Sequence, residues 1–193
     1  MVGKVAERRE ARTQEIVEVA WQLAAVEGIG GFSLHGVARE LGIRQPSLYE
    51  YFDSKLALYD AMFADGNRKL LARIAGLPLP DDPRRAVKAF MRAFVEFAVE
   101  ETARMELLFS RPIPGFEPSE ESYAPAVTVL ERSRTLLRAA GMRSQSDVDC
   151  IIAMVGGLIS AQMSNEPGGT RWVRHLDRLI DLYLDHLPQR RAR

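Results

Sequence analysis

The stretch between residues 33 and 55 restricts the possible folds of this chain most strongly, because it has the pattern of two short helices joined by a tight turn. Ser33 is a suitable N-cap for the first helix. Gly42 can adopt the left-handed conformation that ends it, and Pro46 fits in the first turn of the second helix. The pattern predicts a helix-turn-helix over about residues 33–52.

The side chains of this stretch divide into an apolar set and a mainly polar set. The apolar set, which would fill the corner between the helices, is Val37, Ala38, Leu41, Ile43, Leu48 and Phe52. The set that would face outward is Arg44, Gln45, Ser47, Tyr49, Glu50 and Tyr51.

A family resemblance is carried by the segments SLHGVAREL and GIRQPSLYEYFDSK. Together they closely resemble the N-terminal DNA-binding domain of the TetR family of bacterial transcriptional regulators, over about residues 9–70. The resemblance implies that Ser33, Tyr49, Tyr51 and Lys55 hold DNA phosphates and that Arg44, Gln45 and Ser47 lie nearest the base edges. The chain departs from the family at Gly36, where a helix former is usual and where glycine costs about 1 kcal/mol relative to alanine.

The charge balance does not by itself favour nucleic-acid binding. The whole chain has 26 basic and 26 acidic residues, and residues 1–64 have 7 basic and 9 acidic ones, a net charge of 7 − 9 = −2. A local basic surface is nevertheless predicted where Lys4, Arg8, Arg9 and Arg12 cluster near the N-terminus. The alternative is a mixed, solvated surface.

Composition favours a soluble globular protein, since 47% of the residues are hydrophobic and 27% are charged. The single cysteine, Cys150, excludes a disulfide framework within the chain. The polar N-terminus does not resemble a secretory signal, and no apolar run reaches about 18 residues. We therefore expect a cytoplasmic protein without a membrane partner.

Helical periodicity continues on both sides of the motif, so the predicted fold is all-α. The turn-rich segment LPLPDDP separates a three-helix DNA-binding domain, residues 1–76, from a C-terminal helical bundle, residues 77–193, with a two-helix dimerisation face. Apart from the motif, helices are predicted over about residues 8–27, 54–76, 82–101, 119–140, 146–163 and 170–187, with a short segment around residues 105–109.

Aromatic and methionine side chains form a wide stripe in the first part of the bundle. Such a stripe is usually core, but it could also line a cavity for a small apolar or aromatic effector. The candidate ligand-binding residues are Phe90, Met91, Phe94, Phe97, Met105 and Phe109. In the following helix, Tyr123, Val127, Leu130 and Leu137 are predicted to face inward.

The run Cys150–Met163 contains no charged residue. It is too short to span a bilayer, so it predicts a helix that is buried on more than one side. Gly156 and Gly157 suggest close approach by another helix. The candidate residues of a homodimer interface are Ile152, Gly156, Gly157, Leu176, Ile180 and Tyr183. A monomeric bundle that covers these faces internally is the alternative.

The sequence contains no recognisable catalytic, metal-binding or cofactor-binding motif. The combined prediction is a transcriptional regulator, not an enzyme, that binds a palindromic operator as a dimer and is released by a ligand. The alternative is a helical small-molecule-binding protein or enzyme without a DNA function.

Overall fold

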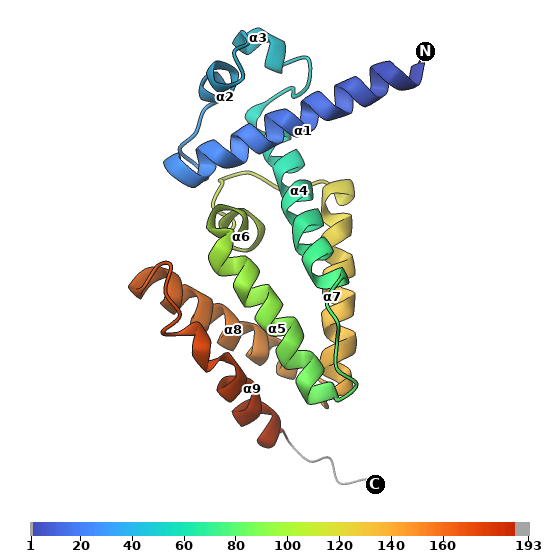
Figure 1. Cartoon of the computed structure of the whole chain (residues 1–193), viewed down its shortest axis with the longest axis vertical. Helices are drawn as coiled ribbons and strands as arrows, with labels where there is room; N and C mark the ends of the chain where they lie inside the picture. The colour runs from blue at the N-terminus through green and yellow to red at the C-terminus, as the bar shows by residue number, and fades with distance from the viewer. Residues whose placement is uncertain (1, 188–193) are drawn as a thin grey trace. The chain divides into compact units, whose positions relative to one another are not determined.

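The computed structural model describes residues 2–187, and these are helical with no strand, which confirms the all-α prediction (Figure 1). The elements are α1 Val2–Glu27, α2 Leu34–Glu40, α3 Gln45–Leu48, α4 Lys55–Ala75, α5 Pro83–Glu100, α6 Thr102–Phe109, α7 Glu120–Ala139, α8 Gln145–Asn165, the 3-10 turn η1 Val173–His175, and α9 Leu176–Asp185.

The chain folds into two compact units that do not follow the order of the sequence. Unit 1 contains the residues up to Lys69 together with Thr102–Pro125, and unit 2 contains Leu70–Glu101 together with the residues from Ala126 onward. Both α4 and α7 therefore contribute to each unit. The predicted functional boundary at residue 76 is a different kind of division, and it stays a prediction.

The core of unit 1 is built mainly by α1, α2 and α4, because their apolar residues recur at helical spacing. A contribution from a distant part of the sequence completes it. Leu107 of α6 is 3% exposed in this core, and Ile113 and Phe116, from the segment after α6, pack against it. The three-helix domain predicted from the sequence is therefore packed against residues 102–125.

The ends of α2 follow the predicted local chemistry. Ser33 Oγ accepts a hydrogen bond of 3.0 Å from the backbone N–H of Gly36 and so caps the helix. Gly42 has a φ of 66°, and the next N–H, that of Ile43, donates to the carbonyl of Ala38 over 3.0 Å. These are the features of a Schellman ending, which turns the chain sharply toward α3.

Three predicted helix boundaries were wrong. The first helix begins at Val2 and not near Arg8, because the preceding residues are compatible with continued helix. The capping box of α8 is made by Ser144 and Asp147, so its N-cap lies two residues before the predicted Ser146 and the helix begins at Gln145. The last helix is shorter than predicted, because the Oε1 atom of Gln162 accepts a hydrogen bond from the Trp172 backbone N–H and holds the chain in another conformation.

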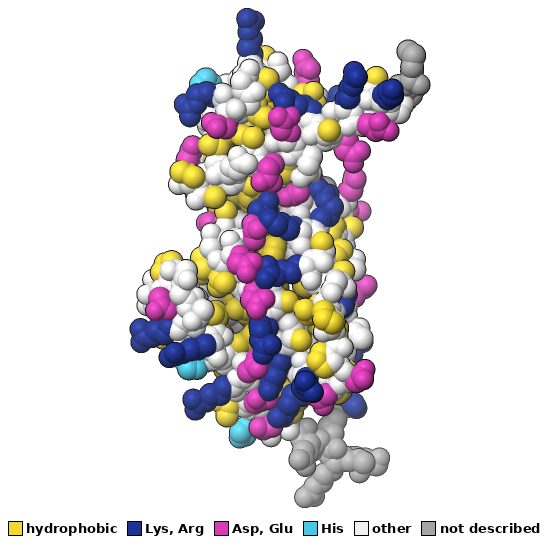
Figure 2. Space-filling model, in the orientation of Figure 1, with side chains coloured by type: hydrophobic (Ala, Val, Ile, Leu, Met, Phe, Trp, Pro, Cys, Tyr) yellow, Lys and Arg dark blue, Asp and Glu magenta, His cyan; other side chains and the backbone are white. Residues whose placement is uncertain are grey.

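In unit 2, α5 packs against α8 and α9. Its buried residues include Val87, Phe90, Phe97 and Ala98. Cations spaced four residues apart on α5 pair with aspartates spaced four residues apart on α9, and Figure 2 shows dark blue and magenta side chains alternating along this face. The pairs are Arg84 with Asp185, Lys88 with Asp181 and Arg92 with Asp177. These pairs run in opposite directions along the two helices and fix their antiparallel register.

The side of α7 that was predicted to face inward is partly exposed, so this prediction was wrong. Tyr123, Val127 and Leu130 are 42%, 41% and 36% exposed, whereas Leu137 is buried as predicted. Periodicity identifies residues that share a helix face, but it does not identify which part of that face other elements cover.

Helix α8 exposes much of its apolar surface. The 14 uncharged residues lie within a helix of 21, and by length and composition alone this helix is apolar enough to cross a membrane, with a mean hydropathy of 1.3. The length argument made from the shorter run therefore does not hold. Only 28% of the apolar stretch of α8 is buried.

Candidate nucleic-acid interface

The candidate interface is the outer side of the α2–α3 corner in unit 1. Helix α3 has Arg44 as its N-cap and Pro46 in its first turn, and the chain continues through turn residues to Phe52. Leu48 is 1% and Phe52 is 6% exposed, so this pair anchors the corner in the core as predicted. The side chains between and beside these anchors are consequently directed outward.

The exposure of the predicted DNA-contacting residues fits an accessible surface. Arg44 and Ser33 are exposed, and Tyr49 is 47% exposed. The half-buried members are Gln45, Ser47, Tyr51 and Lys55. The structure thus brings all seven residues together in unit 1, whereas their individual contacts with DNA stay predictions.

Lys55 has a more elaborate environment than the sequence indicated. Its Nζ atom lies 3.3 Å from the carbonyl oxygen of Gly30, 4.7 Å from the ring centroid of Phe32 and 5.2 Å from that of Tyr59. The hydroxyl of Tyr59 donates to the carbonyl of Ile29 over 2.7 Å. Two rings and a carbonyl therefore hold the ammonium group near the start of α4, where a cation would otherwise be disfavoured by the helix dipole.

Arg9 makes a contact that sequence reasoning missed. One of its terminal nitrogens donates to the backbone carbonyl of Glu50 over 2.8 Å, and its guanidinium carbon lies 5.5 Å from the ring centroid of Tyr51. The sequence placed Arg9 in a general basic cluster, because nothing local connects it with residues 41 positions away.

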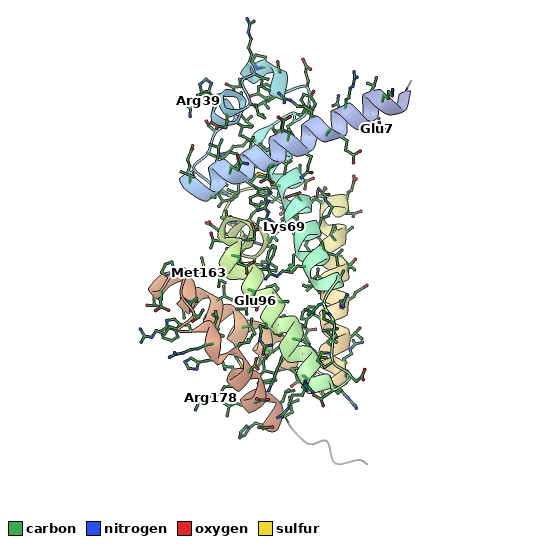
Figure 3. All side chains as sticks on the ribbon, viewed as in Figure 1. Glu7, Arg39, Lys69, Glu96, Met163 and Arg178 are labelled. Carbon is green, nitrogen blue, oxygen red and sulfur yellow. The ribbon has the colours of Figure 1, made fainter. Side chains whose placement is uncertain are left out.

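The N-terminal half of α1 is exposed and carries charges of both signs. Lys4 and Arg8 are exposed, and Glu7, labelled on α1 in Figure 3, is exposed among them. Arg12 pairs with Glu15 over 2.5 Å. The basic character of the interface therefore depends on the positions of individual side chains.

A largely buried polar cluster connects α6 with α1 and α4, and it was also missed by sequence reasoning. The guanidinium of Arg104, a residue 8% exposed, lies 4.6 Å from the Trp21 ring centroid and 3.6 Å from carboxylate oxygens of both Glu18 and Asp65. Asp65 also accepts hydrogen bonds from Trp21 Nε1 over 2.9 Å and from Gln14 Nε2 over 3.0 Å. This arrangement fixes α6 against both helices.

The candidate ligand-binding residues are divided between the two units. Phe90, Met91 and Phe97 are buried in unit 2, where Phe94 is half-buried. Met105 and Phe109 belong to unit 1, and Phe109 is 49% exposed. A cavity shared by all six stays a prediction.

The candidate dimer residues also differ in accessibility. Ile152 is 55% exposed, and a Cβ atom added to Gly156 or Gly157 would meet no atom within 4 Å. Leu176 and Ile180 are 3% and 0% exposed, so their side chains already pack inside unit 2. The open part of the predicted interface therefore lies on α8.

Tyr183, the remaining candidate, is half-buried. Its hydroxyl donates to a carboxylate oxygen of Asp147 over 3.3 Å. Burial, with the neighbouring Asp147 and Cys150, raises the pKa of Tyr183 to about 12. This phenol is therefore a neutral hydrogen-bond donor at physiological pH.

Two family models match the chain. Residues 16–62 match the model described as bacterial regulatory proteins of the tetR family, and residues 87–187 match the tetracyclin repressor-like C-terminal domain. The first match contains the α2–α3 corner.

Curated relatives include the HTH-type transcriptional regulator Rv1816 of Mycobacterium tuberculosis, which is 30% identical over 65% of this chain and 56% of its own length. The HTH-type transcriptional repressor DrrR1 of Streptomyces coeruleorubidus is 32% identical over 77% of this chain and 52% of its own length. The chain thus spans about half the length of these relatives.

Solved structures share the fold. The TetR family regulator PfmR from Thermus thermophilus has a TM-score of 0.67 at 22% identity, covering 90% of this chain and 99% of its own. A protein of unknown function from Rhodococcus sp. RHA1 has a TM-score of 0.73 at 21% identity, covering 92% of this chain and 95% of its own. Because the C-terminal model alone matches more than half of the residues, the chain belongs to the TetR family of transcriptional regulators.

Proposed function

We propose that this protein represses transcription by binding a palindromic operator as a homodimer and that a small apolar or aromatic molecule releases it. The proposal is carried by the α2–α3 corner, whose apolar residues are anchored in the core while its polar side chains remain accessible. The relative DrrR1 is named a repressor, which favours negative regulation. We expect the protein to act in the cytoplasm, without an enzymatic activity.

Within this proposal, Arg44, Gln45 and Ser47 lie near base edges, while Ser33, Tyr49, Tyr51 and Lys55 hold phosphates. Ser33 is the N-cap of α2, and backbone N–H groups without a partner in the first turn of a helix suit a phosphate. The rings around Lys55 would hold its ammonium group in position before DNA arrives, which lowers the ordering cost of binding.

The homodimer would form through the exposed side of α8. Ile152, Gly156 and Gly157 offer an uncharged surface without a large side chain at the two glycines, which suits a second α8 helix at close range. The α2–α3 corners of the two subunits must then match half-sites about 34–36 Å apart. An effector bound among the C-terminal helices would alter this separation through α4.

The effector site would include the part of the stripe on α5 in unit 2, which is Phe90, Met91, Phe94 and Phe97. Shortening Phe94 or Phe97 should change effector affinity more than DNA affinity if these rings line the site. The effector itself can be sought by mass spectrometry of small molecules that co-purify with the protein. Equal losses of effector and DNA binding, with a lower melting temperature, would identify the rings as core.

Fluorescence anisotropy with DNA flanking the protein's own gene tests the proposed function. Lys55→Ala should weaken binding to all sequences and reduce the slope of log K against log salt by about 0.9, because one phosphate contact is lost. Arg44→Ala should chiefly relax preference at one base pair, by about 1–3 kcal/mol.

Arg178→Ala is the matched control, since it removes one exposed cation from α9 (Figure 3). It should leave affinity, sequence preference and salt slope unchanged. If the wild type shows no saturable binding to these DNAs, the alternative of a small-molecule-binding protein or enzyme without DNA function is favoured. The balanced charge of the chain is the observation that supports that alternative.

A further inference from the structure

Arg9 connects the exposed half of α1 with the end of α3. It donates a hydrogen bond to the Glu50 carbonyl and lies over the Tyr51 ring. These two residues are consecutive and follow α3. We propose that Arg9 is a positioning residue, which holds the Tyr51 ring and the end of α3 in a DNA-binding geometry instead of contacting a phosphate itself. The inference rests on the proposed DNA-binding function.

Within residues 2–187, no backbone N–H donates to the Glu50 carbonyl that Arg9 contacts. At the end of α3, the carbonyl of Leu48 accepts from the N–H groups of both Tyr51 and Phe52, each over 2.9 Å. Carbonyls in a last helical turn have no partner within the helix and carry partial negative charge. Glu50 lies two residues beyond Leu48, the last residue of α3, and a guanidinium that donates to its carbonyl places a positive charge beside the helix end, which the helix dipole favours.

The ring that Arg9 covers is one that the proposed function places at a phosphate. A guanidinium over an aromatic ring restricts the ring and leaves the phenol hydroxyl at its edge able to donate. Tyr49 provides an internal comparison, because it is 47% exposed and no cation is recorded over its ring in the described part of the chain. Tyr51 is thus ordered before binding, whereas Tyr49 must be ordered during it.

Arg8 is the matched control that the sequence itself supplies. It has the same charge, lies on the same exposed part of α1, and points about 100° away around the helix. Within residues 2–187, no hydrogen bond or ion pair is recorded for Arg8. Any effect common to both arginines reports net charge, and any difference reports the contacts of Arg9.

The decisive measurement is the salt dependence of operator binding in the full-length protein. Arg9→Ala should weaken binding about two- to tenfold, the range for ordering one side chain, without changing the slope of log K against log salt. Arg8→Ala should not combine a weaker affinity with an unchanged slope. If Arg8 contacts a phosphate, its loss lowers the slope by about 0.9, and if Arg8 lies far from the DNA, neither the affinity nor the slope changes. Arg9→Lys should restore only part of the affinity, since an ammonium can reach the carbonyl but has no plane to cover the ring.

A double-mutant comparison identifies the group through which Arg9 acts. In a Tyr51→Leu background, Arg9→Ala should lose most of its effect on affinity, because the ring that it holds is gone. Undiminished losses in that background would overturn the proposal. A slope reduced by about 0.9 in Arg9→Ala would also overturn it, because that is the result for a phosphate contact.

Hydrogen exchange of the free protein tests, without DNA, whether Arg9 holds the end of α3 in place. Arg9→Ala should speed exchange of the Tyr51 and Phe52 amides, whose bonds to Leu48 close the end of α3, and Arg8→Ala should not. Unchanged exchange in Arg9→Ala would overturn the proposal. If Arg9→Ala speeds this exchange but the wild type binds no DNA, the proposed function fails, whereas the role of Arg9 in holding the end of α3 is retained.

Discussion

Replacing Arg104 by methionine should destabilise unit 1, because this guanidinium is the cationic member of a largely buried cluster. The side chain of Arg104 is 10% exposed and that of Asp65 is 14% exposed. Removing one partner of a buried ion pair costs about 3–5 kcal/mol. Two features lower the expected cost: the 3.6 Å separation, and the two neutral donors that Asp65 retains, Trp21 Nε1 and Gln14 Nε2.

The lost cation–π contact with Trp21 adds about 0.5–2 kcal/mol, partly offset by the thioether of methionine, which also packs on rings. We therefore expect Arg104→Met to lower the free energy of unfolding by about 2–4 kcal/mol. The change should be seen in urea denaturation followed by Trp21 fluorescence. Trp172→Phe would provide the background, since Trp21 is then the sole tryptophan.

Arg12→Met is the control for this measurement. Its ion pair with Glu15 is between neighbours on one helix, and the Glu15 side chain is 53% exposed. Such a pair contributes about 0–1 kcal/mol. If Arg104→Met destabilised the protein no more than Arg12→Met, the argument that the α6 contact depends on this cluster would be refuted.

Three further predictions concern helices. Gly36→Ala should raise the free energy of unfolding by about 0.5–1 kcal/mol in urea denaturation, because alanine is the better helix former. The nearest atoms to the added Cβ, Ser33 Oγ at 3.4 Å and Leu23 Cδ1 at 3.7 Å, leave room for it, and a loss of stability would show that the helix cannot accept it. Hydrogen bonds from Ser144 lower the pKa of Asp147 below 3.8, so the advantage of wild type over Asp147→Asn should be full above pH 3.8 and shrink as pH falls through the lower, folded-state pKa; a difference that is constant in acid titrations would contradict this. Gly157→Glu should dissociate the proposed dimer in analytical ultracentrifugation, because burying an unpaired charge costs several kcal/mol, and a monomeric wild type at micromolar concentration would exclude the dimer.

The local features of the fold could be predicted because the groups that cause them are close in sequence. The bond from the Gly36 N–H to Ser33 and the left-handed Gly42 both depend on residues within one or two turns. The same holds for the start of α5, where Asp82 accepts from the Arg85 N–H over 2.8 Å. The helix-turn-helix and its outward residues were therefore evident from the sequence.

The start of α9 and the exposure of one face of α7 could not be predicted by such local reasoning. Whether the chain before α9 is helical depends on Gln162, ten residues earlier, whose side chain competes for backbone N–H groups. The exposure of Val127 and Leu130 depends on what covers α7, which periodicity does not encode. Both outcomes are set by packing.

The sequence by itself determined that this chain is all-α, that it carries a TetR-type helix-turn-helix, and which side chains face outward from it. Only the tertiary structure decided how those side chains are held. Arg9 meets Glu50 across 41 positions, Lys55 meets Gly30 across 25, and Arg104 reaches Asp65 from a helix far along the chain. Helix periodicity and capping act over a few residues, whereas the partners of a long cationic side chain depend on which helices pack together and in what register.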